Sequence, residues 1–122
     1  MPILDVELVV PSRSELPRGL AQQIANEVGR VLNTPPGNTW VRLRVLDGSH
    51  YAENGEEIEP GDLPVFVEVL KHTPASGAAL DKEVSGLTAA IAKVVGRSSD
   101  RVHLEYAPAL AGRQAFGGRI VR

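Results

Sequence analysis

The chain contains no cysteine among its 122 residues. This absence excludes disulfide bonds, thiolate catalysis and zinc sites that use thiolate ligands. Histidine is also scarce, because His50, His72 and His103 fall in three separate segments and no H-E-x-x-H pattern occurs. We therefore expect no metal site.

Neither sign of charge is in large excess, and long hydrophobic runs are missing. The 13 lysine and arginine residues stand against 15 aspartate and glutamate residues, which gives a formal net charge of -2. Non-specific nucleic-acid binding needs a basic surface, so we expect no nucleic-acid partner. No segment reaches the length of a membrane span, and the chain does not open on a signal peptide. We expect a single cytoplasmic domain, residues 1–122, with no membrane partner.

An internal repeat organises the chain. Six residues of the first half recur at the same spacing in the second: Leu20, Ile24, Ala25, Val28, Gly29 and Arg30 are answered by Leu87, Ile91, Ala92, Val95, Gly96 and Arg97. Pro2 and Pro64 each precede an apolar run, so the pseudo-repeat halves are residues 2–62 and 63–122. Each half is predicted to form a β-α-β unit.

Apolar residues three or four apart predict one helix in each half. In the first half the series runs from Leu16 to Val31, with Pro17 in the first turn and Ser12 and Glu15, or Ser14, as possible caps. In the second half it runs from Leu80 to Val94 and ends near Gly96. Both helices have one apolar face to bury.

Four segments alternate between apolar and polar residues, as strands do: 3–10, 41–45, 65–71 and 102–106. The crossover in a β-α-β unit makes its two strands parallel. The predicted fold class is therefore α/β, of the α+β kind: two tandem β-α-β units that form a four-stranded sheet with two helices on its apolar face.

The other face of this sheet is predicted to be charged. It carries Asp5, Glu7, Arg42, Arg44, Glu68, His103 and Glu105. Parallel sheets rarely leave a face open to water, so we expect other subunits to cover it, with charges paired across the interface. The alternative is a solvated face on a monomer.

Pro2 stands directly between Met1 and the first strand. If Met1 is removed, the chain begins with a secondary amine, and desolvation or a nearby cation lowers the pKa of an α-amino group from its ordinary value of about 7.7 to 8.0. Such an amine is suited to act as a general base near neutral pH. The alternative is that Pro2 only begins a strand, where its missing N–H is tolerated.

The order of these features resembles the tautomerase superfamily, and its double-length members in particular. The resemblance rests on Pro2, the two β-α-β halves, Pro35-Pro36 ahead of the second strand, Ser99-Asp100-Arg101-Val102 ahead of the fourth, and a glycine-rich tail. It covers nearly the whole chain. It implies a homotrimer whose sheets form an inner barrel, with active sites at subunit boundaries. It also implies a tautomerase or isomerase in which Pro2 is general base and acid for enol–keto proton transfer on a small, carboxylated substrate. This chemistry needs no cofactor.

The resemblance also suggests residues that bind substrate. Arg42 matches a substrate-binding arginine of relatives, although Arg42 and Arg44 also have Asp5, Glu7 and Glu105 as possible partners on the charged face. Lys71, His72 and Thr73 close the third strand where relatives bring backbone up to the proline. Lys71 would help keep the Pro2 amine neutral, and His72 is a possible donor or second acid.

Four further residues fall where relatives place pocket walls. His103 and Glu105 match positions that reach a neighbouring subunit's pocket, and they either bind substrate or neutralise an arginine. Phe116 matches a pocket aromatic, and the flanking Arg113 could bind an anion. Residues 113–118 could instead be a turn before a short last strand at 119–121.

Two alternative functions stay open. One is a decarboxylase or hydrolytic dehalogenase on the same scaffold, which is disfavoured because no arginine pair ends the third strand and the tail lacks the acidic residue of the dehalogenases. The other is a non-catalytic interaction protein of the same fold.

Overall fold

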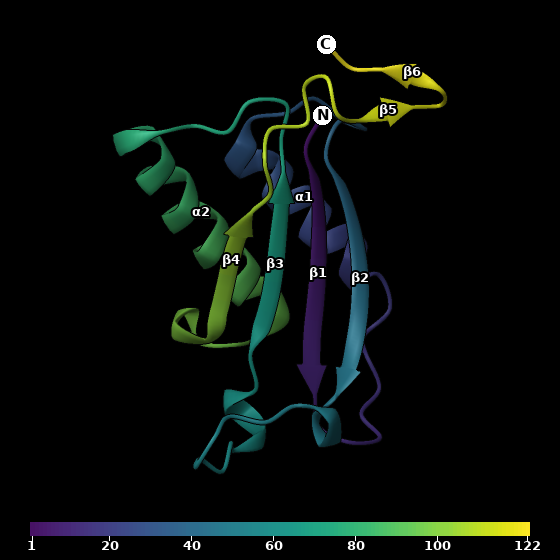
Figure 1. Cartoon of the computed structure of the whole chain (residues 1–122). Coiled ribbons are helices and arrows are strands. Elements are labelled where there is room, and N and C mark those ends of the chain that lie inside the picture. The colour runs from purple at the N-terminus through teal and green to yellow at the C-terminus, as the bar shows by residue number, and fades with distance from the viewer.

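The computed structural model describes residues 1–122 and shows a four-stranded sheet with two helices behind it (Figure 1). The elements are β1 (Ile3–Val10), α1 (Leu20–Leu32), β2 (Trp40–Asp47), β3 (Val65–Leu70), α2 (Gly77–Val95), β4 (Val102–Tyr106), β5 (Ala115–Phe116) and β6 (Arg119–Ile120). Three short 3-10 turns complete the list, η1 (Gly48–His50), η2 (Pro60–Asp62) and η3 (Ser99–Arg101). Neither helix is both long and apolar enough to cross a membrane.

The sheet confirms the predicted pair of β-α-β units. Its strand order is β2-β1-β3-β4, with β1 parallel to β2 and β3 parallel to β4. The two units join through β1 and β3, which are antiparallel. Both helices lie on the same face of the sheet (Figure 1), so the opposite face is open.

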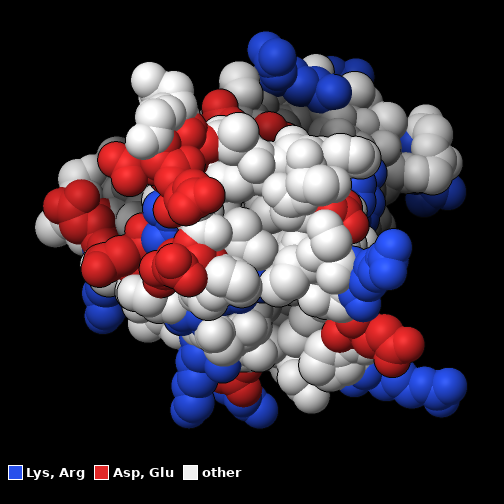
Figure 2. Space-filling view, turned by 90° about the horizontal axis from the view of Figure 1, so that it is seen from below, with Lys and Arg blue, Asp and Glu red and all other residues white.

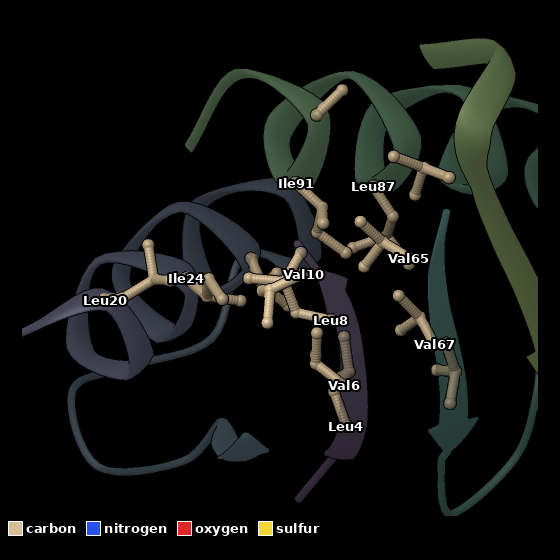
Figure 3. Close-up of a cluster of buried hydrophobic side chains, with 14 residues drawn as sticks. Leu4, Val6, Leu8, Val10, Leu20, Ile24, Val65, Val67, Leu87 and Ile91 are labelled. Atoms are coloured by element: carbon tan, nitrogen blue, oxygen red, sulfur yellow. The ribbon is translucent and has the colours of Figure 1, made fainter. Parts of the chain in front are cut away.

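The core lies between this sheet and the helices, as the strand alternation predicts. Leu4 and Val6 of β1, Val65 of β3, and Ile24 and Leu87 of the two helices are all fully buried. They belong to one cluster of 14 buried residues (Figure 3). The regular alternation of the strands therefore fixes which face receives the helices.

Helix α1 begins later than predicted. The predicted caps, Ser12, Ser14 and Glu15, do not act, and the helix begins at Leu20 after Gly19. Gly19 has a φ of 76°, which is incompatible with a right-handed helix and suits glycine. Leu16 still packs against the core from the preceding loop, so its contribution to the periodic pattern does not come from the helix.

The predicted end of α2 is confirmed. The helix ends at Val95, and Gly96 follows in the left-handed conformation, with a φ of 70°. The tail differs slightly from prediction, since residues 113–121 form a small antiparallel hairpin of β5 and β6 rather than a turn and one strand.

The end of the sheet that holds η1 and η2 is acidic on one side. Figure 2 shows this end, with Asp and Glu side chains gathered together. A shallow depression here is lined by Glu57, Glu59, Asp62 and Asp100, with Arg101 beside them. This side would repel an anion.

Two isoleucines that differ in burial should respond unequally to the same substitution. Ile91 is 0% exposed and Ile120 is 45% exposed. Ile91→Ala should lower the free energy of unfolding by about 2–5 kcal/mol, because it leaves a cavity among packed side chains. Ile120→Ala should change it by about 0.5 kcal/mol or less. Urea unfolding at a fixed chain concentration measures both, and equal losses would contradict this description of the core.

Candidate active site

Pro2 lies buried at one end of the sheet, directly before the central strand β1. Its carbonyl oxygen accepts a hydrogen bond from the Trp40 backbone N–H at 3.0 Å, whereas Met1 is 44% exposed. Ile3 pairs with Leu70 at the end of the antiparallel ladder. One residue further, Pro2 therefore lies across from Lys71.

The tail of the chain crosses this same end. The Leu110 N–H donates to the Lys71 carbonyl at 2.9 Å, and the Leu110 side chain is only 2% exposed. Beyond it, the Phe116 ring meets the Trp40 ring edge-on, with centroids 5.3 Å apart. Figure 1 shows the N-terminus next to the base of the β5–β6 hairpin. The fold thus brings Lys71 and Phe116 to the end of the sheet that holds Pro2.

Lys71 makes an ion pair that the sequence analysis missed. Its Nζ donates to Glu83 Oε1 of α2 at 2.6 Å, and the two side chains are only 20% and 13% exposed. The Tyr106 hydroxyl donates to the other carboxylate oxygen, also at 2.6 Å. Burial, and then the hydrogen bond to Glu83, raise the pKa of Tyr106. A signal was present, because Glu83 falls inside the apolar stripe from Leu80 to Leu87 and a carboxylate there needs a partner.

His72 and Thr73 also lie at this end, after β3. His72 Nδ1 is 2.9 Å from Thr73 Oγ1, and its Nε2 is 3.0 Å from the backbone oxygen of Arg122. Arg113 is exposed in the turn that follows Leu110, to whose carbonyl its backbone N–H donates at 2.8 Å. Pro2, Lys71, His72, Thr73, Arg113 and Phe116 thus share one end of the molecule.

Arg42, His103 and Glu105 lie instead on the open face of the sheet. Arg42 binds Asp5 with two hydrogen bonds of 2.5 and 2.7 Å, the partner that the alternative interpretation gave it. The register forms one row across the strands, in which Arg42, Asp5, Glu68 and Glu105 are successive neighbours. His103 is in the next row, with its ring 5.6 Å from that of Phe66. Within one chain these residues do not meet Pro2, so any role at its site requires a second chain.

Two hollows adjoin these groups. The larger, a groove of about 850 Å³ between α1 and β2, includes Trp40 in its lining but not Pro2. The smaller, about 270 Å³, lies on the open face and is lined by Asp5, Glu7, Arg44, Phe66, Glu68, His103 and Glu105, among others. No group of three or more His, Asp or Glu side chains is arranged to hold a metal ion. Trp40 lines the larger groove, and its backbone N–H donates to the Pro2 carbonyl, so the groove lies next to the Pro2 end of the sheet.

Comparison with known proteins identifies the fold. No family model and no curated protein matches the sequence. Solved structures do match: Pt0534 inactivated by 2-oxo-3-pentynoate has a TM-score of 0.75 and 15% identity, with 98% of this chain and 94% of that chain covered. The macrophage migration inhibitory factor of Trichinella spiralis gives 0.73 and 12%, with 96% and 97% covered. A fused 4-OT described as a symmetric trimer gives 0.70 and 13%, with 98% and 94% covered. The chain has the tautomerase-superfamily fold.

These matches cover nearly the full length of the chain. Both halves of the predicted repeat therefore lie within the matched fold. At identities of 12–18%, the likeness concerns the fold and not the reaction. Catalytic roles of individual residues therefore stay predictions.

The Asp5–Arg42 pair generates a pH-dependent prediction. The hydrogen bond from Arg42 is the main cause that lowers the pKa of Asp5. Arg42→Met should therefore raise the Asp5 pKa toward its ordinary value of about 3.9. Because the folded-state pKa is depressed, the pair stabilises the wild type above about pH 4, and this stabilisation is lost as pH falls through the pKa of folded Asp5.

Carboxyl ¹³C titration of Asp5 measures the shift. Arg44→Met is the matched control, because Arg44 lowers the Asp5 pKa only through charge and makes no hydrogen bond to it. Its effect should be clearly smaller. Equal effects of the two substitutions would contradict the assignment to the bidentate bond.

Proposed function

We propose that the protein is a tautomerase that uses Pro2, freed by removal of Met1, as general base and acid. The observation that carries this proposal is the burial of Pro2 at a sheet end, across from a lysine, in this fold. Burial disfavours the charged amine, and the part of the Lys71 charge that its carboxylate partner does not offset disfavours it further. Both effects favour the neutral base at neutral pH.

The proposed reaction transfers one proton and needs no cofactor. The neutral Pro2 nitrogen removes the hydroxyl proton of a small enol, and the oxygen becomes a carbonyl. The electrons of the carbon–carbon double bond then take the proton back from the Pro2 ammonium at the neighbouring carbon. His72 and Arg113, which lie at the same end, supply a donor and a cation for a substrate carboxylate.

A homotrimer is part of the proposal. The fused 4-OT is described as a symmetric trimer and has this fold. The open sheet face of the present chain exposes Phe66 by 38%, beside charges such as Arg44. Covering this face with neighbouring chains would bury Phe66 and bring Arg42, His103 and Glu105 of one chain near the Pro2 end of the next.

The trimer is tested by sedimentation. The wild type should sediment at about three times its chain mass of 13.0 kDa. Arg44→Glu should weaken association by about 100-fold, because it adds a fourth glutamate to a face that carries Glu7, Glu68 and Glu105. Arg18→Glu makes the same charge change in an exposed loop before α1 and should leave the mass unchanged. A monomeric wild type would overturn the assembly.

Pro2→Ala tests the reaction. With phenylenolpyruvate as substrate, kcat/KM should fall by about 100-fold or more, because the replacement loses the secondary amine. Pro64→Ala is the matched control. Pro64 opens the second half of the repeat, is also buried, and accepts a backbone hydrogen bond from Val9 at 3.2 Å, as Pro2 does from Trp40. Intact-mass measurement shows whether Met1 has been removed.

Equal activity of wild type and Pro2→Ala would remove Pro2 from the mechanism. A wild type that retains Met1 and lacks activity would favour a non-catalytic interaction protein. As a second readout, 2-oxo-3-pentynoate, the reagent that inactivated Pt0534, should add its whole mass at Pro2 of the processed wild type. In this addition the nitrogen bonds to the alkyne and its proton moves to the neighbouring carbon.

A further inference from the structure

We propose that Glu83 sets the basicity of Pro2 by neutralising Lys71, which makes Glu83 a positioning residue of the site. This inference uses the free Pro2 amine of the proposed function. It goes beyond that function because Glu83 and Tyr106 are not predicted from the sequence, and because it says what determines the pH at which the base becomes active.

Pro2 and Lys71 lie on the same side of the sheet. Leu4 and Val6 of β1 are buried against the helices, and the alternation of a strand puts Pro2 on that side too. Lys71 continues the alternation of β3, and its bond to Glu83 shows that its side chain points toward α2. Cross-strand neighbours of this kind have Cβ atoms about 5 Å apart, so the Lys71 side chain leaves the sheet directly beside Pro2.

Glu83 opposes that charge. The ammonium and the carboxylate are joined at 2.6 Å, and both are mostly shielded from water, so the pair acts on Pro2 as a nearly neutral unit. The Tyr106 hydroxyl holds the second carboxylate oxygen, which fixes the orientation of Glu83 toward Lys71. Without Glu83, the full charge of Lys71 would act on Pro2.

The other charged groups at this end come from four segments. They are Glu27 and Arg30 near the end of α1, which pair with each other, His72 after β3, Asp81 and Lys82 on the exposed side of α2, and Arg113, Arg119 and Arg122 of the tail. The carboxylates of β1, β3 and β4 face the open side of the sheet. Asp81 is exposed to solvent and Glu27 pairs with Arg30, so Glu83 is the acidic group that binds the cation across from Pro2.

A second cluster of a tyrosine, a glutamate and a cation supplies a matched control at the opposite end of the sheet. There Tyr51 donates to Glu53, and Glu53 also binds Arg101, with Tyr51 and Arg101 both 2.5 Å from the same carboxylate oxygen. Arg101 immediately precedes β4, whereas Tyr106 ends it. The two clusters therefore have the same chemistry at opposite ends of one strand, and Glu53→Gln makes the same change of charge far from Pro2.

The experiment is a ¹⁵N-proline NMR titration of the full chain after treatment with methionine aminopeptidase, with removal of Met1 checked by mass. A free secondary amine resonates far from the amide nitrogens of the other prolines. Glu83→Gln should lower the Pro2 pKa by about one unit, and Lys71→Gln should raise it by a similar amount. The double variant should return close to wild type, and Glu53→Gln should leave the Pro2 pKa unchanged. Retained amide spectra show that each variant is folded.

Opposite shifts that cancel in the double variant support the inference, since a merely structural role would move the Pro2 pKa in one direction or not at all. No shift, or shifts of the same sign, would overturn it even if Pro2 is catalytic. If the shifts occur but the wild type converts no enol, the proposed function fails and the electrostatic coupling stands. In an active enzyme, the acid limb of kcat/KM should move with the Pro2 pKa, to lower pH in Glu83→Gln.

Discussion

The central position of β1 determines where every other element lies. Its alternate side chains from Leu4 to Val10 are buried against the helices, and it is hydrogen-bonded on one edge to β2 and on the other to β3. Sliding β1 by one residue would expose the entire buried set and bring Asp5 and Glu7 into the core. The register is therefore strongly fixed. Pro2 directly precedes this strand, so its position is fixed together with the strand. Pro2 therefore has a defined environment, which no separate loop has to hold in place.

The duplicated sequence is used differently at its two ends. Pro2 and Pro64 are both buried before a strand, yet β1 and β3 are antiparallel, so the two prolines lie at opposite ends of the sheet. At the Pro64 end, the cluster of Tyr51, Glu53 and Arg101 lies beside solvent-exposed acidic residues. At the Pro2 end, the tail covers the end of β3 and contributes Leu110 as a buried contact. Two halves of similar secondary structure thus produce two chemically distinct ends of the sheet.

The sequence predicted the strands and α2 well because their patterns have one physical cause each. Alternation marks a strand with one buried side, and Gly96 supplies the left-handed residue that ends a helix. The predicted start of α1 was wrong because Leu16 fits the helical spacing but packs against the core from a loop. Only the backbone conformation at Gly19 shows that the helix begins later. The Lys71–Glu83–Tyr106 cluster was missed for another reason. Periodicity predicts which side of a helix or strand is buried, but it does not predict which residues of α2 lie over which residues of the sheet. The contacts of Glu83 with Lys71 and Tyr106 depend on that alignment.

The open face connects assembly with the site through its charge pattern. Arginines occupy the β2 edge, at Arg42 and Arg44, while Glu105 occupies the β4 edge, and Asp5 already satisfies Arg42. A surface that is positive at one edge and negative at the other is complementary to a rotated copy of itself in a head-to-tail arrangement, and such contacts close into rings when the rotation permits. The mixed charges of this face are therefore compatible with a ring. In a ring the residues that cannot reach Pro2 within their own chain become available to the next.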